Sequence, residues 1–284
     1  MKQIVVLFFT ILLSIAANAQ LTDSSLINTP LSESAIRNPV YKIKPWIDIP
    51  LTVAVDAWSF YGMSVIYGRD AIPQSEILAL DINNVNRFDR PITGNYSLTA
   101  KDASDKFFYG SMPLPLFLLL DKKIRKDGLK IGLLFLETMG TTGTLYTTSA
   151  MIANRYRPYA YNTEVPMEIR TRGGARNSFY AGHPSVVATS TFFMVTVYTH
   201  YHPNMKHKWI LYTLAGGASA ATALLRLQAG QHFKTDVIIG TAIGTLVGLI
   251  VPRIHINKSI TASKITLLPN FKNGGTGFSA YYKF

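Results

Sequence analysis

Apolar runs alternate with short charged segments along the second half of the chain. A helix needs about 20 residues to cross a hydrocarbon core of ~30 Å, and several of these runs are shorter and rich in Thr and Gly. The pattern predicts an all-α, multi-helix bundle embedded in a membrane. A helical core inside a soluble domain is the alternative that the short runs leave open. The runs lie at residues 107–120, 129–152, 184–198, 209–225 and 237–251.

Cationic clusters occupy alternate ends of these runs, at residues 122–126, 206–208 and 253–258. Cytoplasmic loops of membrane proteins carry an excess of Lys and Arg. One face of the bundle is therefore predicted to be cytoplasmic. The loop 153–183 and the turn 226–232 then share the opposite face.

The N-terminal residues 1–19 have the organisation of a secretory signal peptide. Lys2 provides the positive end, residues 4–15 the apolar run, and Ala17-Asn18-Ala19 the small-residue cleavage site. An uncleaved anchor helix is the alternative. A chain exported by such a signal is predicted to be a protein of the bacterial cell envelope. The face of the bundle opposite to the cationic clusters is then predicted to face the periplasm.

The segment 46–67 is apolar but carries Asp48, Pro50 and Asp56. If a signal peptide is cleaved, the mature chain starts outside the cytoplasm. The run 107–120 must start outside as well, so the segment 46–67 cannot cross the membrane once. It is therefore predicted as a surface or re-entrant helix, within a region that also holds a polar leader and a loop.

The sequence pattern at the end of the chain differs from that of the helical region. Asn273-Gly274-Gly275 separates the two stretches 265–271 and 278–284. Such a turn sequence between two apolar stretches predicts a short C-terminal β-hairpin. The predicted organisation has four parts. They are a signal peptide at 1–19, a leader, surface-helix and loop region at 20–106, a helical domain at 107–258 and a hairpin tail at 259–284.

The composition is basic, with 28 Lys and Arg against 16 Asp and Glu and a formal charge of +12. A strong positive charge favours an anionic partner such as phosphate or an anionic lipid. Nucleic acid is not expected, because the sequence has no zinc-finger, RNP or basic-zipper pattern. The absence of cysteine excludes disulfides and thiol catalysis. Nothing in the sequence specifies an oligomeric state.

Candidate chemistry is concentrated in the turn between the last two apolar runs. Gly230 is predicted to end the preceding helix, because glycine takes the left-handed cap conformation at low cost. His232 and Asp236 are four residues apart, which places them on one face of a helix. A carboxylate there can accept from one ring nitrogen and leave the other free to act. Arg226 adds a guanidinium suited to an oxyanion such as phosphate.

Two further polar segments lie on the same predicted face. Arg155-Tyr156-Arg157-Pro158 follows the run 129–152, and Gly182-His183 precedes Pro184. Proline is favoured at the first helical position, and a helix N-terminus attracts anions. The segments together predict a phosphate site. No set of metal ligands is evident, so neither a metal nor a cofactor is predicted.

The three segments resemble the motifs of the type 2 phosphatidic acid phosphatase superfamily, which includes lipid phosphate phosphatases and vanadium haloperoxidases. The family pattern is Lys-x6-Arg-Pro, then Pro-Ser-Gly-His, then Ser-Arg-x5-His-x3-Asp. The resemblance covers roughly residues 129–251. The matching residues are Arg157 and Pro158, then Gly182 and His183, then Arg226, His232 and Asp236.

The sequence also departs from the family pattern. Ala150 stands in place of the lysine, Tyr180-Ala181 in place of Pro-Ser, and Leu225 in place of the serine of the third motif. Two phosphate ligands of the family are therefore missing. Arg155 is a candidate to replace the lysine as a phosphate-binding residue, and Arg172 and Arg176 are others.

The resemblance implies a role for each matching residue. His232 would attack phosphorus and form a phosphohistidine, and Asp236 would hold its ring. His183 would protonate the leaving oxygen and then activate water. Arg157, Arg226 and the Gly182 amide would hold the phosphate oxygens.

The implied activity is metal-independent hydrolysis of a lipid phosphate or pyrophosphate at a membrane. Two alternatives stay open. One is a soluble periplasmic acid phosphatase, and the other is a catalytically weakened membrane protein that binds lipid phosphate. A haloperoxidase is less favoured, because the oxyanion-binding lysine is absent.

Overall fold

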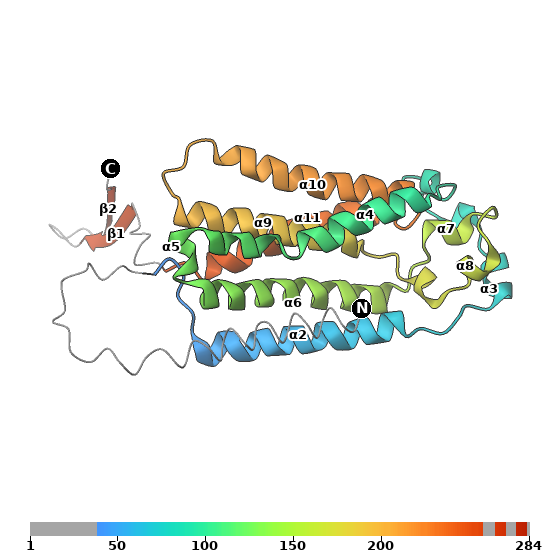
Figure 1. Cartoon of the computed structure of the whole chain (residues 1–284), viewed down its shortest axis with the longest axis horizontal. Coiled ribbons are helices and arrows are strands. Elements are labelled where there is room, and N and C mark those ends of the chain that lie inside the picture. Colours follow the sequence, from blue (N-terminus) through green and yellow to red (C-terminus); the bar gives the residue numbers. More distant parts are fainter. Residues whose placement is uncertain (1–38, 258–264, 271–276, 283–284) are drawn as a thin grey trace. The chain divides into compact units, whose positions relative to one another are not determined.

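The computed structural model describes residues 39–257 and the backbone of 265–270 and 277–282. An all-α helical bundle makes up the first of these ranges (Figure 1). Its long helices are α2 (Pro45–Tyr67), α4 (Leu98–Ser111), α6 (Gly128–Ala153), α9 (Gly182–Tyr201), α10 (Lys208–Gln228) and α11 (Lys234–Ile254). Short helices are α3 (Gln74–Leu78), α5 (Lys122–Arg125), α7 (Pro158–Tyr161) and α8 (Met167–Arg170), with 3-10 turns η1 (Ile82–Asn84), η2 (Arg90–Ile92), η3 (Leu114–Leu120) and η4 (Gly173–Arg176).

Helix α9 lies at the centre of the bundle and packs against α11, α10, α4 and α6. Glycines allow its closest contact, which is with α11. A Cβ added to Gly240 or Gly244 would lie only 2.3 or 2.1 Å from a carbonyl oxygen of the segment that starts α9. Small residues let helix backbones approach closely where the surrounding solvent offers little hydrophobic drive. This contact fixes the start of α11 next to the start of α9.

The segment 46–67, predicted as a surface or re-entrant element, is instead a full helix of the bundle. Helix α2 has 23 residues and packs along α6. Its polar groups face the protein: Asp48 is buried and accepts the Lys44 amide at 2.6 Å. Asp56 lies against Gly140 of α6, where an added Cβ would be 2.3 Å from the carboxylate. Asp48 is therefore paired within its own helix and Asp56 lies against α6.

Within residues 39–257, three helices, α2, α10 and α11, are long and apolar enough to cross a membrane. Helix α2 begins at the end of the bundle that holds α5 and ends at the opposite end, near α7 and α8 (Figure 1). A crossing by α2 would put residues 44 and 68 on opposite faces of the membrane. A cleaved signal peptide and a periplasmic site at the α7 end then exclude one another. The predicted signal peptide, Met1 to Ala19, lies outside the described residues.

A small apolar cluster supports the loops at the α7 end. It joins the segment before α3 to the loop between α6 and α9, and its buried members are Ile72, Ile77, Tyr159, Ala160, Val165 and Ala175. Near the end of the chain, strands β1 (Ile265–Asn270) and β2 (Gly277–Tyr282) pair antiparallel, with Ile265 opposite Tyr282. The predicted turn at Asn273 to Gly275 lies outside the described residues.

Candidate active site

Three helix ends bring the predicted site residues together at the α7 end of the bundle. Helix α6 ends at Ala153 with Asn154 in the left-handed conformation, which turns the chain toward Arg157. Gly230 has φ of +63°, as its predicted role as a helix stop requires. Its carbonyl accepts the Tyr159 amide at 3.0 Å, so the first and third motif segments are joined directly.

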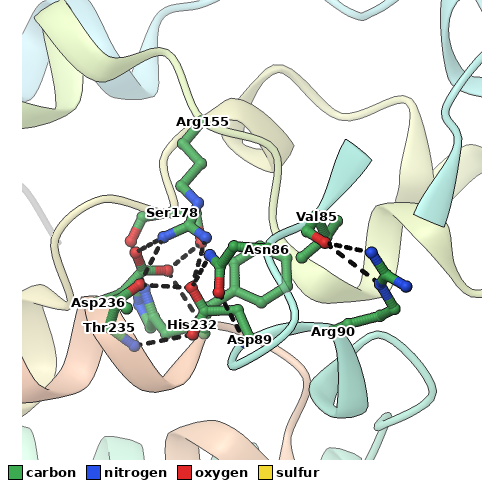
Figure 2. Close-up of polar contacts among 10 residues, drawn as sticks. Val85, Asn86, Asp89, Arg90, Arg155, Ser178, His232, Thr235 and Asp236 are labelled. Carbon is green, nitrogen blue, oxygen red and sulfur yellow. Dashed lines mark hydrogen bonds and ion pairs between the residues drawn. The ribbon is translucent and has the colours of Figure 1, made fainter. Parts of the chain in front are cut away.

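His232 is buried, with 1% of its surface exposed. Its Nδ1 lies 2.7 Å from the carbonyl oxygen of Ser178, which can only accept a hydrogen bond (Figure 2). The proton is therefore on Nδ1, and Nε2 keeps its lone pair. Burial and the nearby charges of Arg157 and Arg226 hold the pKa of His232 well below its usual value. The imidazole is neutral, as a nucleophile has to be.

Asp236 does not make the expected contact with the His232 ring. Its carboxylate accepts from the Ser178 hydroxyl at 2.6 Å and from the Phe233 amide at 2.9 Å. The spacing argument required both residues to be on one helix, but α11 begins at Lys234, after His232. Asp236 instead caps its own helix and holds Ser178, whose carbonyl orients the histidine.

Arg155, a predicted phosphate ligand, lies between two carboxylates. Its guanidinium donates to Asp236 at 2.5 Å and to Asp89 at 2.8 Å, and it lies over the Phe233 ring (Figure 2). Both carboxylates are fully buried. Burial raises the pKa of Asp89, but hydrogen bonds from Thr235 and Arg155 outweigh it and leave the pKa lowered. Arg155 therefore pairs with two buried carboxylates, and its role as a phosphate ligand stays a prediction.

Arg157 and Arg226 converge on one side chain. Both are buried, and both guanidiniums donate to one oxygen, Oε1 of Gln231, at 2.6 and 3.4 Å. Arg157 is held in place by the Gly174 carbonyl at 3.0 Å. Within the described part of the chain, Nε of Arg226 is buried without a hydrogen-bond partner. Arg226 is also paired with Asp105 at 3.3 Å, so the two guanidiniums share one neutral acceptor and one carboxylate, and the pair keeps a net positive charge that favours an anion.

His183 is oriented by helix α4, although none of the predicted site residues lies on that helix. Its Nε2 lies 2.9 Å from Asp105, and the ring of Phe108 stacks on it at 4.4 Å. Asp105 also accepts from Lys101 at 2.9 Å and from Arg226 at 3.3 Å. Burial and the Arg226 charge lower the pKa of His183 to about 4. In the sequence, the only sign of this role of α4 is the spacing of four residues between Lys101 and Asp105. That spacing is also typical of a solvated helix face.

Gly182 is the first residue of α9, so its amide has no partner within the helix. A Cβ added there would lie 3.0 Å from the ring of Tyr146. The glycine is therefore needed for the close approach of this ring. The two positions that depart from the family pattern, Ala150 and Ala181, are both buried.

Several other charged side chains lie away from the cluster formed by the arginines and the two histidines. Arg176 pairs with Glu76 at 2.7 Å, and Arg172 is exposed. Glu137, His255 and Asp48 meet at the α5 end of the bundle, where both carboxylates lie within 3.6 Å of the imidazole. Among residues 39–257, no group of three or more His, Cys, Asp or Glu side chains is arranged to hold a metal ion.

Comparison with known proteins gives a family match and two similar solved structures. The family model of the PAP2 superfamily matches residues 131–260. No curated protein matches the chain. Two similar solved structures are Aquifex aeolicus LpxE and a transmembrane PAP2 type phosphatidylglycerolphosphate phosphatase from Bacillus subtilis. The first is 20% identical with a TM-score of 0.40, covering 58% of this chain and 92% of the other. The second is 21% identical with a TM-score of 0.38, covering 74% and 92%. The match to the PAP2 superfamily at residues 131–260 includes all of the predicted site residues.

Proposed function

We propose that this protein is a phosphatase that hydrolyses a lipid phosphate or pyrophosphate through a phosphohistidine intermediate. The observation that carries the proposal is the arginine clamp beside a neutral histidine. Arg157 and Arg226 converge on a single oxygen, and His232 in the adjacent turn has its proton fixed on Nδ1. A phosphate that replaces the Gln231 oxygen would accept from both arginines and present phosphorus to Nε2.

The first step forms a bond between Nε2 of His232 and phosphorus and breaks the bond from phosphorus to the leaving oxygen. That oxygen takes a proton from His183. In the second step His183 accepts a proton from water, the water oxygen bonds to phosphorus, and the P–N bond breaks. Inorganic phosphate leaves and both histidines return to their starting states. The arginines and the Gly182 amide stabilise the charge that develops on the phosphoryl oxygens.

A lipid substrate is supported by the helices around the site. Helices α10 and α11 both meet the site, and both are long and apolar enough to span a membrane. Their outward faces carry exposed apolar side chains, among them Trp209, Leu214, Leu224, Ile238, Leu246 and Ile250. A substrate anchored in the same membrane would be delivered directly to this end of the bundle.

Phosphate release is expected to survive EDTA and to be inhibited by vanadate, because two arginines and helix amides supply the positive field. The detergent-solubilised protein should be assayed on phosphatidic acid, phosphatidylglycerol phosphate, undecaprenyl pyrophosphate and p-nitrophenyl phosphate. Turnover of the water-soluble substrate alone would favour the soluble acid phosphatase. Binding of a lipid phosphate without release would favour the non-catalytic alternative. Loss on chelation with recovery in Mg²⁺ or Zn²⁺ would contradict the proposal.

The site is proposed to face the periplasm, because the cationic clusters lie at the opposite end of the bundle. The chain has no cysteine, so single-cysteine variants give clean labels. Thr163→Cys is exposed at the site end and Asn204→Cys is exposed near the cationic cluster 206–208. In spheroplasts, a membrane-impermeant maleimide should label the first directly and the second only after permeabilisation. The reverse pattern would place the site in the cytoplasm. Labelling of both would mean that neither end is shielded by a membrane.

A further inference from the structure

The site lacks the two ligands that the family supplies through lysine and serine. Ala150 and Ala181 stand at these positions, with 1% and 0% of their surface exposed. Neither methyl group can donate a hydrogen bond to a phosphate oxygen. Arg155, the nearest cation in sequence, is engaged by Asp236 and Asp89. The missing donors must therefore come from another part of the site, or the site has fewer of them.

Tyr146 lies one turn before Ala150 on α6 and therefore on the same face of that helix. Its ring reaches the phosphate end of the site: the position of a Cβ on Gly182 is 3.0 Å from both Cε2 and Cζ of Tyr146. Cζ carries the hydroxyl group, which places the phenol oxygen next to the start of α9. The side chain is only 6% exposed. A buried phenol normally has a hydrogen-bond partner.

The end of α2 lies beside Tyr146, because Ile66, the residue before its last residue Tyr67, packs in one apolar cluster with Tyr146, Ala150 and Tyr180. The phenols of Tyr146 and Tyr67 interact electrostatically with Arg226, and Tyr146 also interacts with Arg157. The Tyr146 ring therefore lies against Gly182, at the end of the bundle that holds both guanidiniums. Helix α2 lies outside the segment that matches the family model, so this contribution comes from a different part of the chain.

We propose that Tyr146 donates a hydrogen bond to a phosphate oxygen and so replaces part of the phosphate binding of the missing lysine and serine. Tyr67 would assist by donating a hydrogen bond to the Tyr146 oxygen. The inference rests on the proposed function, since it assumes that phosphate binds between Arg157, Arg226 and the Gly182 amide. A phenol can donate to the anion and accept from a second phenol at the same time. Hydrogen bonds from hydroxyl groups to charged oxygens are short and strong.

The experiment compares Tyr146→Phe and Tyr67→Phe with the matched control Tyr180→Phe. Tyr180 packs against Tyr146 with ring centroids 5.8 Å apart, but its hydroxyl donates to the Thr142 carbonyl at 3.4 Å. All three changes remove only one oxygen atom. The first readout is the inhibition constant of vanadate against p-nitrophenyl phosphate hydrolysis. The second is the thermal stabilisation that vanadate gives in the His232→Asn background, which needs no turnover.

For Tyr146→Phe, we expect kcat/KM to fall about 10²-fold, the lower end of what loss of one such donor costs, with vanadate binding weakened about tenfold. Tyr67→Phe should show the same pattern with a smaller loss, and Tyr180→Phe should stay within about twofold of wild type. If Tyr146→Phe matches Tyr180→Phe in both readouts, the phenol is a packing residue and the inference fails, while the proposed function stands. If wild type itself neither hydrolyses phosphate esters nor binds vanadate, the proposed function fails and the inference fails with it.

If Tyr146→Phe lowers the melting temperature strongly, its loss of activity could come from the lost donor or from a destabilised fold. Tyr67→Phe then decides between these two explanations. Tyr67 is 58% exposed at the end of its helix, so removal of its hydroxyl should not disturb the core. Weakened vanadate binding in a normally stable Tyr67→Phe variant supports the proposal. Unchanged binding in that variant overturns it.

Discussion

His232→Asn is expected to reduce turnover to background on every substrate, a loss of more than about 10⁴-fold in kcat. Asparagine can still donate its side-chain amide to the Ser178 carbonyl, which holds the imidazole at 2.7 Å. The fold should therefore persist, but the nitrogen lone pair that attacks phosphorus is lost. The measurement is phosphate release together with the melting temperature. Residual activity near wild type, in a folded variant, would remove His232 from the role of nucleophile.

His183→Asn provides the matched comparison, because it removes the acid and not the nucleophile. A positioned acid contributes about 10²–10⁴-fold. The loss should be large on a lipid phosphate and small on p-nitrophenyl phosphate, whose leaving group needs little protonation. Equal losses on both substrates would mean that His183 does not protonate the leaving oxygen.

The pH dependence follows from the same pair of histidines. The pKa of His183 is lowered to about 4, so its acidic form declines as pH rises above that value. The pKa of His232 is also lowered, so the nucleophile stays neutral over that range. For a lipid phosphate, kcat/KM should therefore fall with rising pH. Bound phosphate raises the pKa of His183 by its negative charge, so kcat should persist to higher pH than kcat/KM.

Arg155→Ala is expected to cause the largest loss of stability among the site arginines. The change would leave the buried carboxylates of Asp89 and Asp236 without their cation. Removal of one partner from a buried ion pair costs about 3–5 kcal/mol. Arg155 itself is about a quarter exposed, with a side-chain exposure of 26%, so the lower end applies. A loss of about 3 kcal/mol corresponds to a fall of roughly 6–12 °C in Tm for a domain of this size.

Two variants control this measurement. Arg172→Ala removes an exposed arginine of the same loop and should leave Tm close to wild type. Asp89→Asn added to Arg155→Ala removes one of the unpaired charges and should recover part of the loss. Arg157→Ala should behave in the opposite way to Arg155→Ala, with weak vanadate binding and a smaller change in Tm. If Arg155→Ala weakens vanadate binding as much as Arg157→Ala at unchanged Tm, then Arg155 is a phosphate ligand after all.

The sequence by itself determined the helical class and predicted which residues meet at one end of the bundle. Apolar runs of helical length predict the bundle, and a glycine with positive φ ends α10 at the predicted turn. The clamp of Arg157 and Arg226 beside two histidines also follows from the sequence. These features depend on residues close together in the chain or on a recognisable spacing, which is why they could be found without a structure.

Only the tertiary structure decided what surrounds and orients these residues. His183 is held by Asp105, 78 residues away, and Arg155 meets Asp89 across 66 residues. No local periodicity encodes such contacts. The i,i+4 argument failed for His232 and Asp236 because the helix begins between them, a boundary that one residue can move. The charged residues of α2 indicated a surface helix, but the structure buries Asp48 with the Lys44 amide as its partner and His255 3.6 Å away. The cost of a buried polar group depends on what lies opposite it, which the sequence does not show.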